Sequence, residues 1–319
     1  MFGFNTNPRP PSIPIDPAKL ELKPNETLTL TLPDNRTLGY ATYGSTSPSD
    51  PVIFLFHGMP GSRICGRTWD TLCARIGARL IAIDRPGCGL SSLAHRSLTD
   101  WPQDIANLAD HLHLPRFSII GASGGGPFAL ACARFIPPAR LRGTTVVCGI
   151  GTMESALAAL PYLPRLGGLT MWITGLVARW LILPRILRPY CTRDAARLKR
   201  VLEDQCSNEA DKALLSDPSR ETNGDDAVVQ FLEAFRQGAR GCWLDGALLT
   251  KDWGFDVRNV PGEKVWLVHG DRDGVAPLSM ARWIDERLGG GRLRVVEGVT
   301  HFTVWKECEE QIFRQSMEA

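Results

Sequence analysis

The sequence predicts an α/β fold in which a mostly parallel, doubly wound sheet of eight strands is interrupted by a helical insertion. Short apolar runs such as VIFLF at 52–56 and VWLVHG at 265–270 suit strands that are buried on both faces of a parallel sheet, and helix-like stretches separate them. The segment 151–240 breaks this alternation with a hydrophobic stripe at helical spacing. A chain of 319 residues is long enough for one sheet domain that carries such an insertion.

The individual elements follow from local patterns. Residues 1–25 are rich in proline, which has no N–H to donate, and they predict an extended arm. Period-two alternation over 27–32, the turn Pro33-Asp34-Asn35 and a returning strand at 37–43 predict a hairpin. The remaining strands are predicted at 52–56, 80–84, 117–121, 144–150, 265–270 and 293–298, and helices at 63–77, 99–113 and 125–136. The sheet domain therefore comprises 26–150 and 241–319, with 151–240 inserted between its two parts.

Composition and charge exclude several classes of protein. Hydrophobic residues make up 44% and charged residues 22%, which is typical of globular chains and not of disordered or fibrous ones. The net charge of +2 supplies no overall attraction to nucleic acid. Nine cysteines without a CxxC pair or metal-ligand spacing predict reduced thiols and no metal site. The N-terminus lacks the apolar segment of a secretory signal, so a cytoplasmic location is expected.

Charge is divided unevenly within the insertion. Residues 179–200 hold seven basic side chains and one acid, a net charge of +6, whereas 203–233 hold nine acids and two basic side chains, a net charge of −7. The favoured interpretation is that the two halves offset each other within one small helical subdomain. The alternative is a basic amphipathic patch that faces a membrane. The uncharged run 166–178 is shorter than the roughly 20 residues that a bilayer-spanning helix needs.

The clearest chemical signal is the pentapeptide Gly121-Ala122-Ser123-Gly124-Gly125, which lies between a predicted strand and a predicted helix. In this G-x-S-x-G pattern the glycines permit a sharp turn that lifts the serine hydroxyl above the sheet edge. Ser123 is therefore the candidate nucleophile. The alternative is a glycine-rich turn with an incidental serine, or one that holds a phosphate.

A serine hydroxyl needs a base to take its proton and a third group to orient that base. His301 follows the last predicted strand, and Asp273 follows the strand before it, so the order is serine, acid, histidine. We predict that His301 is the base and Asp273 the orienting acid. Asp271 and Glu154 are the alternatives for the acid, and the remaining histidines have structural interpretations.

Acyl transfer also needs N–H donors directed at the developing oxyanion. The loop His57-Gly58-Met59-Pro60-Gly61 follows a buried strand and is expected to place the backbone N–H of Met59 beside that of Gly124. The same loop is equally consistent with a simple glycine-proline turn.

Taken together, the motifs resemble those of the α/β-hydrolase superfamily, specifically its capped enzymes with an HGxPG loop. They are His57-Gly58-Met59-Pro60-Gly61, Asp84-Arg85-Pro86-Gly87-Cys88-Gly89-Leu90-Ser91, Gly121-Ala122-Ser123-Gly124-Gly125, His269-Gly270-Asp271-Arg272-Asp273 and His301. The resemblance covers about residues 26–319. It implies the α/β-hydrolase fold, a triad of Ser123, Asp273 and His301, an oxyanion hole of Met59 and Gly124, and a cap formed by 151–240.

Within that superfamily the details favour cleavage of an ester or lactone. Related epoxide hydrolases and dehalogenases carry aspartate at the position of Ser123, and proline iminopeptidases usually show Gly-Gly-Ser-Trp-Gly and HGGPG where this chain has Gly124 and Met59. C–C bond cleavage, acyl transfer or condensation by the same triad stays open, as does a ligand-binding protein without turnover.

The expected partner is a small, fairly apolar ester, lactone or ketone, with no nucleic acid and no cofactor, because no metal cluster, phosphate loop or nucleotide fingerprint occurs. The oligomeric state is undetermined. The residues predicted to contact substrate are His57 and Gly58 of the loop, Met171, Trp172 and Leu176 of the insertion, and Phe302 and Trp305 after His301.

Overall fold

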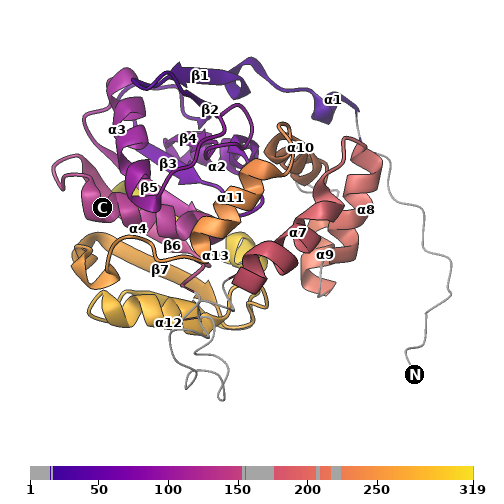
Figure 1. The fold of residues 1–319 in the computed structure, drawn as a ribbon. Helices are drawn as coiled ribbons and strands as arrows, with labels where there is room; N and C mark the ends of the chain where they lie inside the picture. Colours follow the sequence, from indigo (N-terminus) through magenta and orange to yellow (C-terminus); the bar gives the residue numbers. More distant parts are fainter. Residues whose placement is uncertain are drawn as a thin grey trace.

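One sheet of eight strands forms the centre of the protein in a computed structural model, which describes residues 15, 17–152, 155, 176–205, 209–216 and 224–318 (Figure 1). The strand order is β1-β2-β4-β3-β5-β6-β7-β8. The pairs β1–β2 and β2–β4 are antiparallel and all others are parallel, which confirms the predicted fold class. The strands are β1 (Leu28–Thr31), β2 (Thr37–Gly44), β3 (Val52–Phe56), β4 (Arg79–Ile83), β5 (Phe117–Ala122), β6 (Leu141–Val147), β7 (Val265–Gly270) and β8 (Leu293–Val296).

Helices cover the sheet on both faces, and for this reason its central strands are apolar throughout. All five residues of β3 are buried. On one face the core includes α3 (Trp101–His111), α4 (Gly126–Phe135) and α12 (Leu278–Arg287), and on the other α2 (Asp70–Ile76) and α13 (Thr303–Glu318). The edge strand β1, by contrast, alternates between half-buried and exposed residues.

The described part of the insertion is helical, and no strand occurs in it. Figure 1 shows these helices gathered beside the sheet domain, with α10 and α11 nearest to it. The segments are the π-helix η5 (Ala178–Ile182), α7 (Leu183–Leu187), the 3₁₀ helix η6 (Arg188–Tyr190), α8 (Ala195–Gln205), α9 (Glu209–Ser216) and α10 (Gly224–Ala234). The helix α11 (Arg240–Leu249) begins at the predicted end of the insertion and continues beyond it. No helix among the described residues has both the length and the apolar character needed to cross a membrane.

Three segments differ from the prediction. The predicted helix 63–77 begins as the 3₁₀ helix η2 (Arg63–Trp69), where Gly66 packs so closely on Tyr43 that a Cβ would lie 2.4 Å from the ring. Strand β6 begins at Leu141, which pairs with Phe117 before a register shift. Within the predicted extended arm, Pro17–Leu20 forms the short helix α1, because proline is compatible with the first turn of a helix. The remaining short 3₁₀ helices are η1 (Pro24–Glu26), η3 (Leu98–Asp100), η4 (Ser123–Gly125), η7 (Val257–Asn259) and η8 (Gly262–Lys264).

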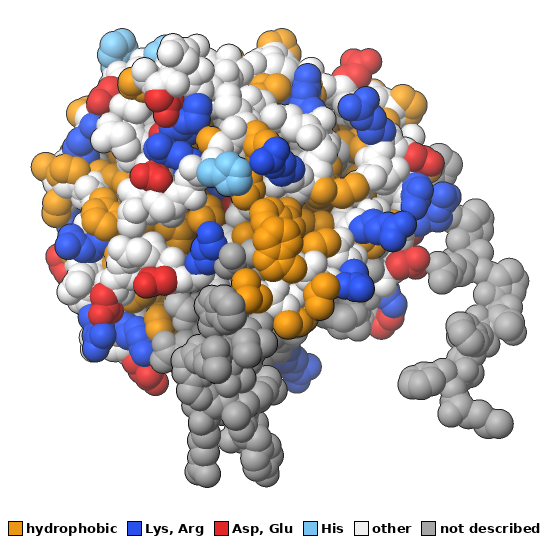
Figure 2. Space-filling model, in the orientation of Figure 1, with side chains coloured by type: hydrophobic (Ala, Val, Ile, Leu, Met, Phe, Trp, Pro, Cys, Tyr) orange, Lys and Arg blue, Asp and Glu red, His pale blue; other side chains and the backbone are white. Residues whose placement is uncertain are grey.

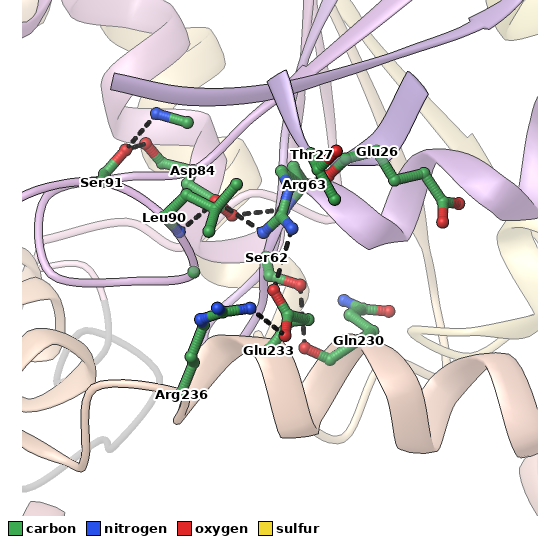
Figure 3. Close-up of polar contacts among 12 residues, drawn as sticks. Glu26, Thr27, Ser62, Arg63, Asp84, Leu90, Ser91, Gln230, Glu233 and Arg236 are labelled. Carbon is green, nitrogen blue, oxygen red and sulfur yellow. Dashed lines mark hydrogen bonds and ion pairs between the residues drawn. The ribbon is translucent and has the colours of Figure 1, made fainter. Parts of the chain in front are cut away.

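A buried ionic clamp joins α10 to the sheet domain (Figure 3). The guanidinium of Arg63 is fully buried and lies 2.9 Å from a carboxylate oxygen of Asp84 and 2.9 Å from one of Glu233 on α10. Beside it, the Ser62 hydroxyl donates to the carbonyl of Gln230 on the same helix at 2.8 Å. These contacts hold α10 at a set position on the loop that follows β3.

A second and a third buried ion pair act in the same way. Arg67 pairs with Glu26 at 2.5 Å and reaches Asp226 of α10 at 3.5 Å. Arg85, at the carboxyl end of β4, pairs with Asp245 of α11 at 2.6 Å. Arg67 thereby holds α10, and Arg85 holds α11, against the first part of the sheet domain.

Candidate active site

Ser123 stands on a sharp turn between β5 and α4. Its φ of +51° lies in the left-handed region, which non-glycine residues rarely adopt. The turn requires its glycines, because a Cβ on Gly121 would lie 2.7 Å from the carbonyl oxygen of Gly125, and one on Gly125 would lie 2.3 Å from that of Phe56. The strand-to-helix context that the sequence predicted for Ser123 is therefore present.

The loop after β3 lies directly against this turn. A Cβ on Gly58 would be 3.9 Å from the Ser123 hydroxyl oxygen, and one on Gly124 would be 3.2 Å from the backbone nitrogen of Met59. Since Gly124 begins a helical turn, its N–H has no partner within that helix. The two amide groups predicted to form an oxyanion hole are thus neighbours, and the positive end of the α4 dipole lies behind them.

His301 and Asp273 form a buried hydrogen-bonded pair. Nδ1 of His301 lies 2.7 Å from Oδ2 of Asp273, and both residues are less than one-tenth exposed. Asp273 follows β7 and His301 follows β8, so the pair is formed by two adjacent loops at the carboxyl edge of the sheet. This contact leaves the other ring nitrogen of His301 as the one available for proton transfer.

The carboxylate of Asp273 is surrounded by donors. Its Oδ1 accepts hydrogen bonds from the backbone N–H groups of Val275 and Ala276, each at 2.8 Å. Burial by itself would raise the pKa of Asp273, but the hydrogen bond from His301 and these two amides hold it below the ordinary value of 3.8. Asp273 therefore stays ionised at neutral pH, as an acid that orients an imidazole must.

The lowered pKa of Asp273 predicts a defined pH dependence of stability. The ionised carboxyl contributes stability that is fully present above the unfolded-state pKa of 3.8 and is lost as the pH falls through the lower folded-state value. We expect the difference in unfolding free energy between the wild type and Asp273→Asn to shrink as the pH falls below about 4. Urea unfolding at a series of acidic pH values measures it, with Glu286→Gln on the exposed side of α12 as control. A difference that grows on acidification would contradict this assignment.

The turn of Ser123 and the His301–Asp273 pair meet through the segment after β6. The backbone N–H of Ile150 donates to the carbonyl of Ser123 at 3.1 Å. Two residues before Ile150, the sulfur of Cys148 lies close to the acid and the base. This sulfur, a carboxylate oxygen of Asp273 and a ring nitrogen of His301 all lie within 4.8 Å of one another. All three residues predicted as nucleophile, acid and base therefore lie at one end of the sheet.

Several contacts of this region were not predicted from the sequence. Cys148 is buried with a φ of +47°, and burial raises its pKa well above 9.0, so it is a neutral thiol beside Asp273. Nε2 of His269 lies 3.3 Å from Oδ2 of Asp273 and donates to the carbonyl of Ala276 at 2.8 Å. The spacing of four residues between His269 and Asp273 is the only sequence signal for that contact.

Arg85 supports the loop that carries Met59. Its guanidinium donates to the carbonyl of Gly58 at 3.0 Å and to that of His57, while it is ion-paired with Asp245. Arg85 belongs to a motif that the sequence singled out, but the motif alone did not reveal this contact.

The residues predicted to contact substrate differ in how far they are packed within the protein. The ring of His57 is buried, bonded to the carbonyl of Gly58 and to the N–H of Arg85, and burial together with the Arg85 charge lowers its pKa far below 6.5. Trp305 packs on Trp69 with ring centroids 4.5 Å apart, because the first turn of α13 presses against the core. Both side chains therefore have packing partners within the protein, and their contact with substrate stays a prediction.

The other predicted contacts differ in exposure. Gly58 is beside Ser123, as described above. The ring of Phe302 is half exposed and lies 5.2 Å from that of His301. Leu176 is half-buried just before η5. Met171 and Trp172 lie outside the residues that the structure describes, as does Glu154.

Comparison with known sequences identifies one family. The family described as "Alpha/beta hydrolase family" matches residues 52–314. A proline iminopeptidase of Lactobacillus helveticus is 35% identical over 103 residues, a match that covers 29% of this chain and 35% of that protein, so the chain spans about a third of the length of this relative. A pimeloyl-(acyl-carrier protein) methyl ester esterase of Aromatoleum aromaticum is 28% identical over 79% of this chain and 91% of its own length.

Comparison with solved structures shows the same fold. A hydrolase from Pseudomonas aeruginosa superimposes with a TM-score of 0.62 at 17% identity, and the match covers 93% of this chain and all of that one. At this identity the similarity concerns the fold.

Proposed function

The chain belongs to the alpha/beta hydrolase family, and from this premise we propose that it is a serine hydrolase that cleaves an ester or lactone of a fairly apolar small molecule. The observation that carries the proposal is the His301–Asp273 pair at 2.7 Å, which lies at the same end of the sheet as the strained turn of Ser123. A nucleophile, a base and an oriented acid are the parts that acyl transfer needs.

In the proposed reaction His301 takes the proton of Ser123 as the hydroxyl oxygen attacks the carbonyl carbon. The carbonyl oxygen becomes an oxyanion, which accepts hydrogen bonds from the N–H groups of Met59 and Gly124. Collapse breaks the bond to the leaving group, and the protonated His301 donates its proton to the departing oxygen. Water then attacks the acyl carbon while His301 takes its proton. The second oxyanion collapses, the bond to the Ser123 oxygen breaks, and His301 returns the proton to that oxygen as the acid is released. Asp273 holds the imidazole in one tautomer throughout.

The preference for an apolar acyl group is supported by the wall beside the two amides. A Cβ on Gly124 would lie 3.3 Å from a methyl carbon of Leu249, and one on Gly246 would lie 2.7 Å from Leu183 and 2.8 Å from the Met59 sulfur. This wall, formed by Leu183 of α7, Leu249 of α11 and Met59 of the loop after β3, presents hydrocarbon and thioether groups. The name of the Aromatoleum relative, a methyl ester esterase, agrees with an ester as the substrate class.

Covalent labelling is the direct test. A fluorophosphonate probe is expected to attach to Ser123 in the wild-type protein, and Ser123→Ala is expected to abolish the labelling, because only an activated serine reacts. Peptide mass analysis locates the adduct. Parallel assays with p-nitrophenyl esters of increasing chain length, lactones and β-diketones rank the reaction types. Labelling that persists in Ser123→Ala would exclude the assignment, and labelling without turnover of any compound would favour a ligand-binding protein.

A further inference from the structure

An apolar patch is exposed on the helical insertion. The cap patch consists of Val177, Trp180, Leu181, Ile182 and Ile186, which are between 41% and 60% exposed. They account for five of the ten exposed large hydrophobic side chains in the described part of the chain. Figure 2 shows hydrophobic side chains gathered on the face that carries α7 and α11, with Lys and Arg side chains around them. Contiguous patches of this kind mark interaction sites, whereas single exposed apolar residues do not.

The helical stretch that carries the cap patch is anchored from its opposite side. Leu183 and Leu187 are buried in a cluster with Phe235 and Cys242. Within the patch itself, the ring of Trp180 lies 5.0 Å from that of Trp243 on α11. The apolar face is thus held outward by packing within the insertion, and it is not a loose segment turned to solvent.

Arginines accompany the cap patch. Arg185 and Arg188 lie within or next to α7, and Arg193, Arg197 and Arg200 lie in or just before α8; all five are exposed. Among the described residues none of these five is ion-paired with a carboxylate. Arg185 and Arg188 therefore present positive charge to solvent on the same stretch of chain as the exposed apolar side chains, and the other three extend it along the next helix.

The acids of the insertion are divided among several partners, so the expectation that its two halves offset each other stays a prediction. The two halves of opposite charge meet, among the described residues, in the ion pair of Lys199 with Asp225 at 2.8 Å. Some of these acids contact the sheet domain: Asp226 lies 3.5 Å from Arg67, Glu233 lies 2.9 Å from Arg63, and the Thr300 hydroxyl donates to Asp211 at 2.5 Å. Others pair within the insertion, as Glu209 does with Lys212 at 2.8 Å and Glu233 with Arg236 at 3.3 Å. The side chains of Arg185 and Arg188, which lie nearest to the cap patch in the chain, are not among those that pair with these acids in the described part of the chain.

We propose that the cap patch binds the surface of an anionic lipid membrane. The aliphatic side chains and Trp180 would enter the boundary between headgroups and acyl chains, and the arginines would contact lipid phosphates. Tryptophan beside leucine and isoleucine, flanked by arginine, matches the chemistry of that boundary layer. The contact is peripheral, because the described helices are too short or too polar to cross the bilayer.

Vesicle co-sedimentation tests this proposal on the full chain. We expect binding to vesicles of phosphatidylcholine with roughly a quarter phosphatidylglycerol, and at least about fivefold weaker binding to phosphatidylcholine alone. The double variant Trp180→Ser/Leu181→Ser is expected to bind the anionic vesicles about tenfold more weakly, and Arg185→Gln/Arg188→Gln at least about fivefold more weakly.

Matched controls come from the rest of the surface. Phe135→Ser removes an aromatic side chain that is 44% exposed on α4, and Arg116→Gln removes an exposed arginine; both are expected to bind as the wild type does. Circular dichroism and the thermal midpoint verify that each variant is folded. The proposal is overturned if the wild type binds no vesicles, if the patch variants bind like the controls, or if sedimentation velocity shows that the patch joins two copies of the chain.

Discussion

Ser123→Ala and His301→Ala are each expected to lower kcat/KM for the best ester substrate by about 10⁴- to 10⁶-fold. The serine supplies the attacking oxygen, and the histidine, held by Asp273 at 2.7 Å, moves the proton in both halves of the reaction. Because the two act as one unit, the double variant is expected to be no slower than either single variant. Steady-state rates measured with one p-nitrophenyl ester give these ratios.

Exposed residues of the same types provide the controls. Ser49→Ala and His111→Ala remove a serine and a histidine from the surface of the sheet domain and are expected to retain wild-type rates. If the losses for Ser123 and His301 added in the double variant, the two side chains would be acting independently. That result, or a fall smaller than tenfold, would remove the basis of the proposed mechanism.

The largest expected effect on stability concerns the clamp at Arg63. Arg63→Met would leave Asp84 buried without its cation and would remove the ion pair with Glu233 on α10. Breaking one partner of a buried pair costs about 3–5 kcal/mol, since the remaining charge keeps its desolvation penalty. Burial already raises the pKa of Asp84, while the charge of Arg63 lowers it, so the loss of Arg63 would raise this pKa further.

Denaturant unfolding measures that loss. The midpoint of Arg63→Met is expected to fall, whereas Arg258→Met, which removes an exposed ion pair with Asp256, is expected to leave it unchanged. The double variant Arg63→Met/Asp84→Asn is expected to recover part of the stability, because a neutral amide is less costly to bury than a carboxylate. An unaltered midpoint for Arg63→Met would show that the clamp contributes nothing net to the fold.

Local sequence patterns were sufficient to predict the strands that lie in the centre of the sheet. The run 52–56 is strand β3 with the predicted bounds, and 265–270 is β7, because continuous apolar runs bounded by turn residues have few other uses in a chain of this composition. Similarly, the glycines around Ser123 predicted a tight strand-to-helix turn from local sequence alone, without information about the rest of the fold. Residues 63–69 deviated because their side chains make tertiary contacts with Glu26 and Asp84 that outweigh local helix preference.

The sequence by itself determined the fold class, the order of the strands along the chain and the candidate residues Ser123, Asp273 and His301, since each of these depends on residue type and spacing within short segments. Only the tertiary structure decided which charges meet. Arg67 pairs with Glu26 across 41 positions and Arg85 with Asp245 across 160, separations over which no sequence pattern specifies a partner. For the same reason the sequence did not reveal that Asp226 and Glu233 of the acidic half contact Arg67 and Arg63 of the sheet domain, while Asp225 pairs with Lys199 of the basic half.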